Sequence, residues 1–329
     1  MTRSKARRKN SATSRRPNVL AVCIAVAAIG VLYVNFDPPP AGAGGTSGAY
    51  AAPVAPPPPM AVTVGEHEGE NGDAAAADER GRSQAVQGRP ALLMQLLLLE
   101  KGIERLSKVP SYTATLHKQE RVDHVLGERQ TVEMKVRHEP FSVYMKWLSF
   151  DPGRELLYVQ GQNDGNMIVH AGGWKARLVP ALNLDPHGSM AMRESRYPVT
   201  MAGLLAAARK MCEFRRTDLG AEQLPVRCAM HFGQRFEGRP CYCFVIESLD
   251  PAYHAGFRKT IAHIDEELCL PVCIRNYAWP IGEDEEQLAG EPLDEATLIE
   301  FYTYTNIGLD NRLADADFDR ANGEYRFKR

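Results

Sequence analysis

The sequence predicts an α+β fold in which one antiparallel sheet of about eleven strands encloses two helices. Apolar and polar residues alternate along much of residues 112–305, as at Val132, Met134 and Val136, and this period of two is typical of strands with one buried face. Pro and Gly interrupt the alternation at short intervals. Neighbouring strands are therefore too close in sequence for helical crossovers, and we expect them to pair antiparallel.

The first helix is expected from Pro90 to Leu106. Proline is tolerated in the first turn of a helix, and Pro110 ends the segment. Apolar residues surround most of this helix. We therefore expect it to be buried against the sheet rather than to lie on the surface.

The other elements follow from the same two patterns. Leu204, Ala208 and Met211 recur at helical spacing and predict a second helix over Thr200–Arg215, with Thr200 as its N-cap. Gly and Pro between the strand candidates are typical of hairpin turns. The expected strands are Tyr112–Val122, Arg129–His138, Phe141–Ser149, Glu155–Gln160, Asn166–His170, Trp174–Pro180, Pro225–Arg235, Pro240–Leu249, Arg258–Glu266, Cys269–Ala278 and Thr297–Thr305.

One folded domain is expected over residues 89–329, preceded by three segments of different composition. Residues 1–18 are basic, and residues 19–36 are uncharged and long enough to cross a bilayer. The positive-inside rule then predicts a single-pass inner-membrane protein with its folded domain in the periplasm. Cleavage of this segment as a signal, which exports the domain, is the alternative. Residues 37–88, rich in Pro, Ala and Gly, are expected to form a disordered tether.

The charge distribution excludes nucleic acid as a partner of the domain. Residues 1–16 hold seven of the 39 Lys and Arg and no acidic residue, which leaves 32 basic against 41 acidic residues in the remainder. Phosphate contacts require a basic surface, and the remainder of the chain is acidic.

The central strands also resemble a known family. The shared residues are Lys135-Val-Arg137, Pro140-Phe-Ser-Val-Tyr144, Trp147, Gly153-x-Glu155-x-Leu-Tyr158, Gly161-x-Asn163-x-Gly165, Glu300-Phe301-Tyr302-Thr303-Tyr304-x-Asn306 and Tyr325-x-Phe327. They are similar to an uncharacterised family of bacterial envelope proteins, itself distantly similar to the LolA/LolB-like lipoprotein carriers. The resemblance covers about Leu92 to Phe327. It implies a strongly curved half-barrel with an apolar concave face, and a carrier role for a lipid or lipoprotein acyl chain.

Cysteine is the first candidate for chemistry. Six cysteines follow residues 19–36, and an even number in an oxidising compartment predicts disulfides. Cys241 and Cys243 point to the same face of one strand, so we expect one of them to pair with Cys228 on the preceding strand. A zinc site is the alternative, but the usual two-residue spacer is absent, and no metal site is assigned. The disulfide candidates are Cys212, Cys228, Cys241, Cys243, Cys269 and Cys273.

No catalytic residue and no cofactor is expected. The sequence has no HExxH, GxSxG, Walker or GxGxxG motif. His138 and His170 end strands and are interpreted as ordinary histidines at the rim of the sheet. The carboxylates Glu133, Glu139, Asp151 and Glu155 are interpreted as solvated charges.

Aromatic residues and methionines form the remaining candidate site. Methionine adapts to varied ligands, and ligand cavities collect aromatic residues, although plain core packing gives the same composition. The sequence therefore leaves two functions open. One is non-enzymatic binding or transport of an apolar ligand in the cell envelope, and the other is a structural or protein-interaction module with a permanently plugged concavity. The candidate lining residues are Met134, Phe141, Tyr144, Met145, Trp147, Tyr158 and Met167.

Overall fold

The structure is a computed structural model that describes residues 85–174, 178–282, 287–310 and 312–327. These residues belong to one compact unit, Asn71–Arg329. The segments expected at 1–18, at 19–36 and over most of 37–88 lie outside the described residues. The inner-membrane location predicted from the sequence is corrected here, because none of the described helices is long and apolar enough to cross a membrane.

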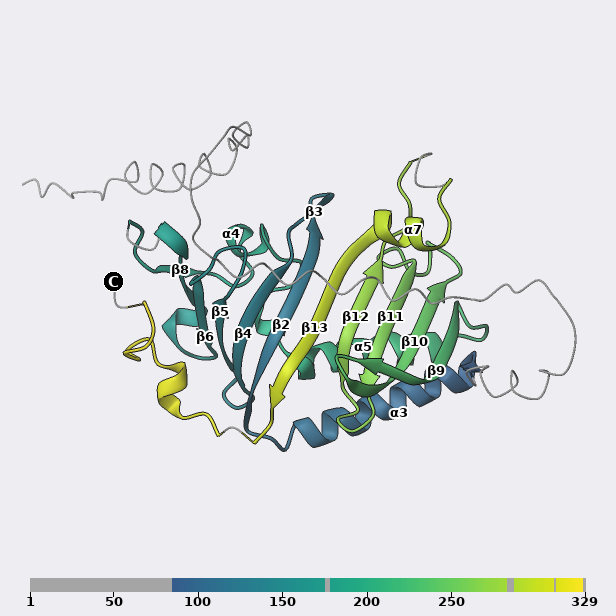
Figure 1. Ribbon diagram of the computed structural model, residues 1–329, viewed down its shortest axis with the longest axis horizontal. Helices are drawn as coiled ribbons and strands as arrows, with labels where there is room; N and C mark the ends of the chain where they lie inside the picture. Colours follow the sequence, from purple (N-terminus) through teal and green to yellow (C-terminus); the bar gives the residue numbers. More distant parts are fainter. Residues whose placement is uncertain (1–84, 175–177, 283–286, 311, 328–329) are drawn as a thin grey trace, which may run out of the picture. The chain divides into compact units, whose positions relative to one another are not determined.

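In the described part of the chain, thirteen strands form one antiparallel sheet (Figure 1). The order is β1-β9-β10-β11-β12-β13-β2-β4-β5-β6-β7-β8, with the short β3 paired to β2. The C-terminal β13 thus joins the two halves of the sheet by pairing with β2. The strands are β1 (Ala85–Gln87), β2 (Ser111–Val122), β3 (Val125–Leu126), β4 (Gln130–Arg137), β5 (Ser142–Trp147), β6 (Glu155–Val159), β7 (Met167–His170), β8 (Leu182–Leu184), β9 (Val226–Phe236), β10 (Arg239–Ser248), β11 (Lys259–Asp265), β12 (Pro271–Tyr277) and β13 (Leu298–Gly308).

The predicted antiparallel sheet with helices is confirmed, but its strand list needs two corrections. Of the strand expected at Trp174–Pro180, the structure describes Trp174, which is 3-10 helical, and residues 178–180, which form a turn and coil. The three additional strands β1, β3 and β8 have only two or three residues each. A strand this short has too few residues to show a period-two alternation.

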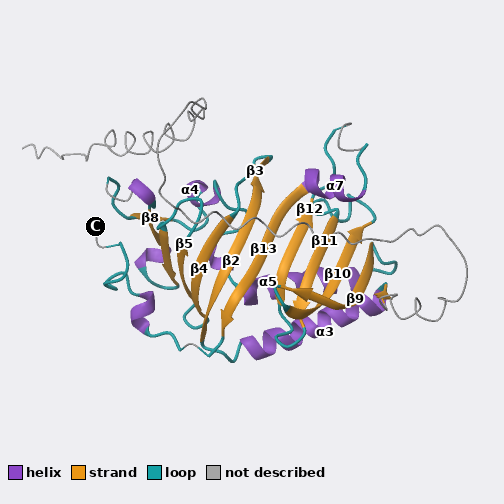
Figure 2. Ribbon diagram, viewed as in Figure 1, coloured by secondary structure: helices purple, strands orange, loops and turns teal. Residues whose placement is uncertain are grey.

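Two long helices, α3 (Arg89–Leu106) and α5 (Leu204–Gly220), pack against each other and against one face of the sheet (Figure 2). We call this face the inner face. Gly102 allows the close approach of α3, because a Cβ atom there would lie 2.2 Å from the carbonyl oxygen of Cys269. Shorter helical segments are α4 (Ser189–Met192), α7 (Gly290–Thr297), η1 (Asn163–Gly165), η3 (Val199–Met201) and η4 (Asp315–Phe318).

Both long helices differ in detail from the prediction. Burial of α3 is confined to one side, and Leu93, Met94 and Leu97 are exposed on the other. α5 begins at Leu204 rather than Thr200, because the buried hydroxyl of Tyr112 accepts a hydrogen bond from the Leu204 amide at 2.9 Å. Gly203 makes room for this contact, since it has a positive φ of 98° and a Cβ atom there would lie 2.5 Å from the Tyr112 oxygen.

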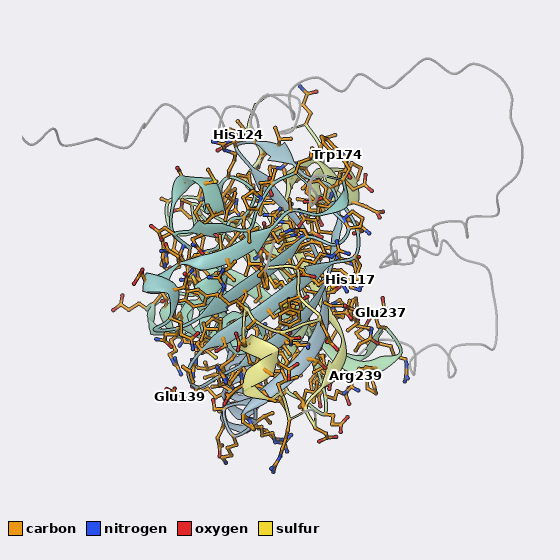
Figure 3. All side chains as sticks on the ribbon, turned by 90° about the vertical axis from the view of Figure 1, so that its left-hand side faces the viewer. His117, His124, Glu139, Trp174, Glu237 and Arg239 are labelled. Carbon is orange, nitrogen blue, oxygen red and sulfur yellow. The ribbon has the colours of Figure 1, made fainter. Side chains whose placement is uncertain are left out.

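The opposite, outer face of the sheet is covered at both ends by chain segments. Toward β5–β7, the C-terminal segment packs its aromatic rings on the sheet, and Tyr325 stacks on Tyr144 with ring centroids 4.0 Å apart. Toward β10–β12, the tip of the β9–β10 hairpin lies over the strands, with Phe236 against His263. Figure 3 shows Glu237 of this hairpin beside His117 of β2.

Candidate functional site

A pocket of about 230 Å³ lies on the inner face of the sheet, and we call it the inner pocket. The sheet forms one wall, α5 forms another, and residues 185–203, the covering segment, close over it. The apolar part of the wall includes Leu116, Val132, Met145, Trp147, Leu156 and Met167 of the sheet, Met190, Ala191 and Val199 of the covering segment, and Ala206, Ala207 and Met211 of α5.

Three of the seven predicted lining residues, Met145, Trp147 and Met167, line the inner pocket. Met134, Phe141 and Tyr158 belong to the same hydrophobic cluster but are not part of the pocket wall. Tyr144 lies on the outer face under the C-terminal segment. Consecutive residues of a strand point to opposite faces, so Tyr144 and Met145 could not both have faced one ligand.

Trp147 is held at the edge of its ring by one side chain and over one face by another. Its Nε1 donates to Oε1 of Gln130 at 2.9 Å, and the guanidinium of Arg154 lies 4.8 Å from the ring centroid. Nη1 of Arg154 in turn donates to Oε2 of Glu194 at 2.6 Å. Glu194, at the middle of the covering segment, is thus held to the sheet beside the apolar part of the pocket.

A pair of buried carboxylates lies in the pocket wall, directly opposite each other on β2 and β13: Glu120 and Glu300. Nζ of Lys118 donates to Glu120 Oε2 at 3.1 Å, and the Tyr302 hydroxyl donates to its other oxygen. Glu300 accepts hydrogen bonds from Asn276 Nδ2 at 2.6 Å, Arg196 Nε at 2.8 Å and the Tyr197 hydroxyl at 3.1 Å.

Burial raises the pKa of Glu300, although its bonds to Asn276 and Arg196 oppose the shift. Burial acts to lower the pKa of Arg196. The charge and hydrogen bond of Glu300 act in the opposite direction, and the net effect is a raised pKa. Arg196 and Tyr197 follow Glu194 by two and three residues, so this network also holds the middle of the covering segment to the sheet. Neither carboxylate was predicted from the sequence as a site residue. The alternation along β2 could have indicated Glu120, because this residue is an even number of positions from Ala114 and Leu116 and therefore points to the same inner face.

The other end of the pocket is basic. Lys210 and Arg215 of α5, and Arg258 and Lys259 beside β11, lie in its wall. Arg215 Nη2 lies 2.9 Å from Asp218 Oδ2, and His254 Nε2 lies 2.8 Å from the other oxygen of that carboxylate. These residues were not singled out from the sequence, because the sheet and helix bring them together from segments about forty residues apart.

The expected disulfide is not formed, and all six described cysteines are buried free thiols. Cys228 lies opposite Ile246 and belongs to the inner cluster, whereas Cys243 lies between His231 and His263 and points to the outer face. The two side chains are therefore on opposite sides of the sheet. Burial raises the pKa of Cys228 to about 12. Among the residues that the structure describes, no three Cys, His, Asp or Glu come together as a metal site.

The expectations for the rim histidines and the solvated carboxylates hold for His138, Glu133 and Glu139 but not for His170 and Glu155. His138 Nδ1 lies 2.8 Å from the Val109 carbonyl oxygen, while His170 is buried opposite Glu155 beneath the C-terminal segment. Glu155 is buried too and accepts a hydrogen bond from the Arg326 amide at 2.8 Å, so its interpretation as a solvated charge is wrong. Glu133 and Glu139 are exposed, as expected.

The family model described as protein of unknown function (DUF1571) matches residues 109–327, and the chain belongs to this family. This match confirms the resemblance to an uncharacterised family. No curated protein matches the chain at a significant level.

Several solved structures match this chain over about two thirds of its length at low sequence identity. Lipoprotein LppX from Mycobacterium tuberculosis is 13% identical with a TM-score of 0.37, and the match covers 69% of this chain and 100% of that one. A putative outer membrane lipoprotein-sorting protein domain from Vibrio parahaemolyticus is 10% identical, with a TM-score of 0.29 and coverages of 68% and 96%. A LolA superfamily protein from Nitrosomonas europaea is 10% identical, with a TM-score of 0.28 and coverages of 68% and 96%.

Proposed function

We propose that this DUF1571 protein binds an apolar ligand, such as the acyl chain of a lipid or lipoprotein, in the inner pocket and catalyses no reaction on it. The observation that carries the proposal is a space of about 230 Å³ that the described side chains leave between the sheet, α5 and the covering segment. Protein interiors normally pack without voids much larger than a water molecule. Pockets for drug-sized ligands measure about 300–1,000 Å³, so this smaller pocket suits part of an acyl chain.

The chemistry of the wall supports an apolar ligand. Met145 and Met167 have flexible side chains that adapt to ligand shape, and Trp147 offers a fixed aromatic surface beside them. Ala206 and Ala207 keep the facing surface of α5 shallow. A half-barrel of the LolA type, which the family resemblance implies, would present such a wall. Transport of the ligand within the cell envelope, which the resemblance also implies, depends on this binding.

The competing function is a structural or protein-interaction module whose concavity is permanently plugged. In that case the covering segment and α5 should fill the concave side of the sheet with their own side chains. The pocket that remains between the described residues favours ligand binding instead.

Filling the pocket tests the proposal. Ala207→Phe places a large side chain in the wall, and Arg209→Phe, at an exposed position on the same helix, is the matched control. The full chain and both variants are titrated with N-phenyl-1-naphthylamine, an uncharged fluorescent apolar probe. We expect Ala207→Phe to abolish saturable binding and Arg209→Phe to retain it. Equal binding by all three proteins, or no saturable binding by the unmodified chain, would overturn the proposal.

A further inference from the structure

The wall of the inner pocket carries a surplus of positive charge. Each of its three acidic side chains is bonded to a cation: Glu120 to Lys118, Glu194 to Arg154 and Glu300 to Arg196. The remaining cations gather at the end formed by α5 and β11. The basic residues of the wall are Lys118, Arg154, Lys210, Arg215, Arg258 and Lys259.

Arg215 is the most deeply buried of these cations, with 6% of its surface exposed. Its Nη2 lies 2.9 Å from Asp218 Oδ2, but Asp218 also binds His254 at 2.8 Å and so divides its charge between two partners. Nε of Arg215 is buried and has no hydrogen-bond partner among the described residues. A buried N–H of a charged group is costly to leave without an acceptor.

Arg258 also has a buried Nε without a hydrogen-bond partner and a carboxylate that it shares with another cation. It donates from Nη2 to Asp294 Oδ1 at 2.5 Å, while Lys259 uses the other oxygen of this carboxylate at 2.7 Å. Two cations thus share one anion, and the buried Nε of Arg258 has no partner in the part of the chain described. Phe214 and Phe257, the residues before Arg215 and Arg258, pack with ring centroids 6.0 Å apart. The two arginines therefore enter the pocket from adjoining segments.

The apolar part of the pocket lies against β5, in the other half of the sheet from β11. Five strand spacings separate β11 from β5, the strand of Trp147, which corresponds to roughly 24 Å along the sheet. A ligand that filled the pocket would have Arg215 and Arg258 in the wall at one end and Trp147, Met145 and Met167 in the wall at the other.

We propose that the ligand is an amphiphile with an anionic head group, a carboxylate or a phosphate, which binds Arg215 and Arg258 while its apolar chain extends toward Trp147. This inference rests on the proposed function. Guanidinium groups bind both anions through paired N–H donors, and an anion in the pocket would give the two arginines a partner that they do not share with His254 or Lys259. An uncharged head group would supply acceptors alone, and the two arginines would keep only the carboxylates that they share with His254 and Lys259.

The test compares three ligands with the same sixteen-carbon chain: palmitate, hexadecyl phosphate and hexadecanol. Each displaces N-phenyl-1-naphthylamine from the full chain, below its critical micelle concentration. The variants are Arg215→Gln, Arg258→Gln and, at the opposite end of the pocket, Arg154→Gln. Arg216→Gln is the matched control, because Arg216 is the exposed neighbour on α5 that pairs with Glu100. Thermal melts establish that each variant is folded at the temperature of the titration.

We expect one or both anions to bind at least tenfold more tightly than hexadecanol, and the better one identifies the head group. Arg258→Gln and, where it folds, Arg215→Gln should reduce this preference to less than threefold with hexadecanol affinity unchanged, and Arg216→Gln should preserve it. Equal binding of anion and alcohol by the unmodified chain overturns this inference and leaves the proposed function intact. Loss of the preference in Arg154→Gln alone also overturns it, because the head group then lies beside Trp147. Failure of all three ligands and of the probe to bind overturns the proposed function itself.

Discussion

The guanidinium of Arg154 lies over the ring of Trp147, 4.8 Å from its centroid, and donates to Glu194 of the covering segment at 2.6 Å. One cation thus connects the aromatic wall of the inner pocket to the segment that closes it. Trp147 is 5% exposed and contacts the pocket, whereas Phe244 on the same face is fully buried in the core. The two residues can therefore separate a ligand-facing role from plain packing.

Trp147→Ala and Phe244→Ala should have opposite effects on stability and binding. Truncation of a packed core aromatic costs about 3–5 kcal/mol, which we expect for Phe244→Ala. Part of the Trp147 surface faces the pocket, so Trp147→Ala should cost clearly less but weaken binding of an uncharged apolar probe at least tenfold. Urea melts and probe titrations measure both quantities. A Trp147→Ala protein that is as unstable as Phe244→Ala, from a chain that binds no probe, would favour the plugged structural module.

Glu300→Gln should loosen the covering segment. The amide keeps the size of the side chain but leaves half-buried Arg196 without its carboxylate, which should cost about 1–3 kcal/mol of unfolding free energy. Amide hydrogen exchange should accelerate at residues 194–199. Glu104→Gln removes an exposed carboxylate paired with Lys108 and is the control, with little change expected in either measurement. Equal, small effects of the two substitutions would show that the network does not hold the segment.

The six described thiols should be free but unreactive in the native protein. Burial raises the pKa of Cys273 to about 12 and those of Cys241 and Cys243 to about 11, so little thiolate forms at neutral pH. Maleimide labelling without reductant should modify these residues only after denaturation. Mass mapping that finds a disulfide-linked peptide among them would contradict the structure.

His263 should make stability depend on pH. Burial, together with nearby Arg275, lowers the pKa of His263 to about 4, whereas an unfolded histidine titrates near 6.5. Between these values the unfolded state binds more protons, so stability falls as pH is lowered from about 6.5 to about 4, by up to about 3 kcal/mol. Urea melts at pH 7 and pH 4.5 should show a smaller difference for His263→Gln than for the unmodified chain. His124→Gln, at an exposed turn, is the control and should leave this stability difference unchanged. If both substitutions reduced the stability difference equally, His263 would not be its source.

Much of the sheet could be predicted from the sequence, because long strands with one buried face impose the alternation seen at Val132, Met134 and Val136. Strands β1, β3 and β8 could not, since two or three residues carry no period. The start of α5 was predicted at Thr200 from capping preference. It lies at Leu204 because Tyr112, some ninety residues earlier in the chain, supplies the hydrogen-bond acceptor.

The candidate site was predicted less well. Three lining residues were predicted because they are methionine or tryptophan. Tyr144 was also predicted, although it alternates with Met145 along the strand and therefore points to the outer face. The Glu120–Glu300 pair and the basic end depend on which strands are neighbours, and one sequence does not show that β13 lies beside β2. The expected disulfide failed for a related reason, because register places Cys228 and Cys243 on opposite faces.

Native mass spectrometry of the full chain, purified without detergent and then incubated with palmitate, tests ligand binding in the inner pocket most directly. We expect one ligand per chain, retained by Arg209→Phe and lost in Ala207→Phe, whose new side chain occupies the pocket. Absence of any bound species in the unmodified protein, or retention of the same one-to-one complex by Ala207→Phe, would contradict this account.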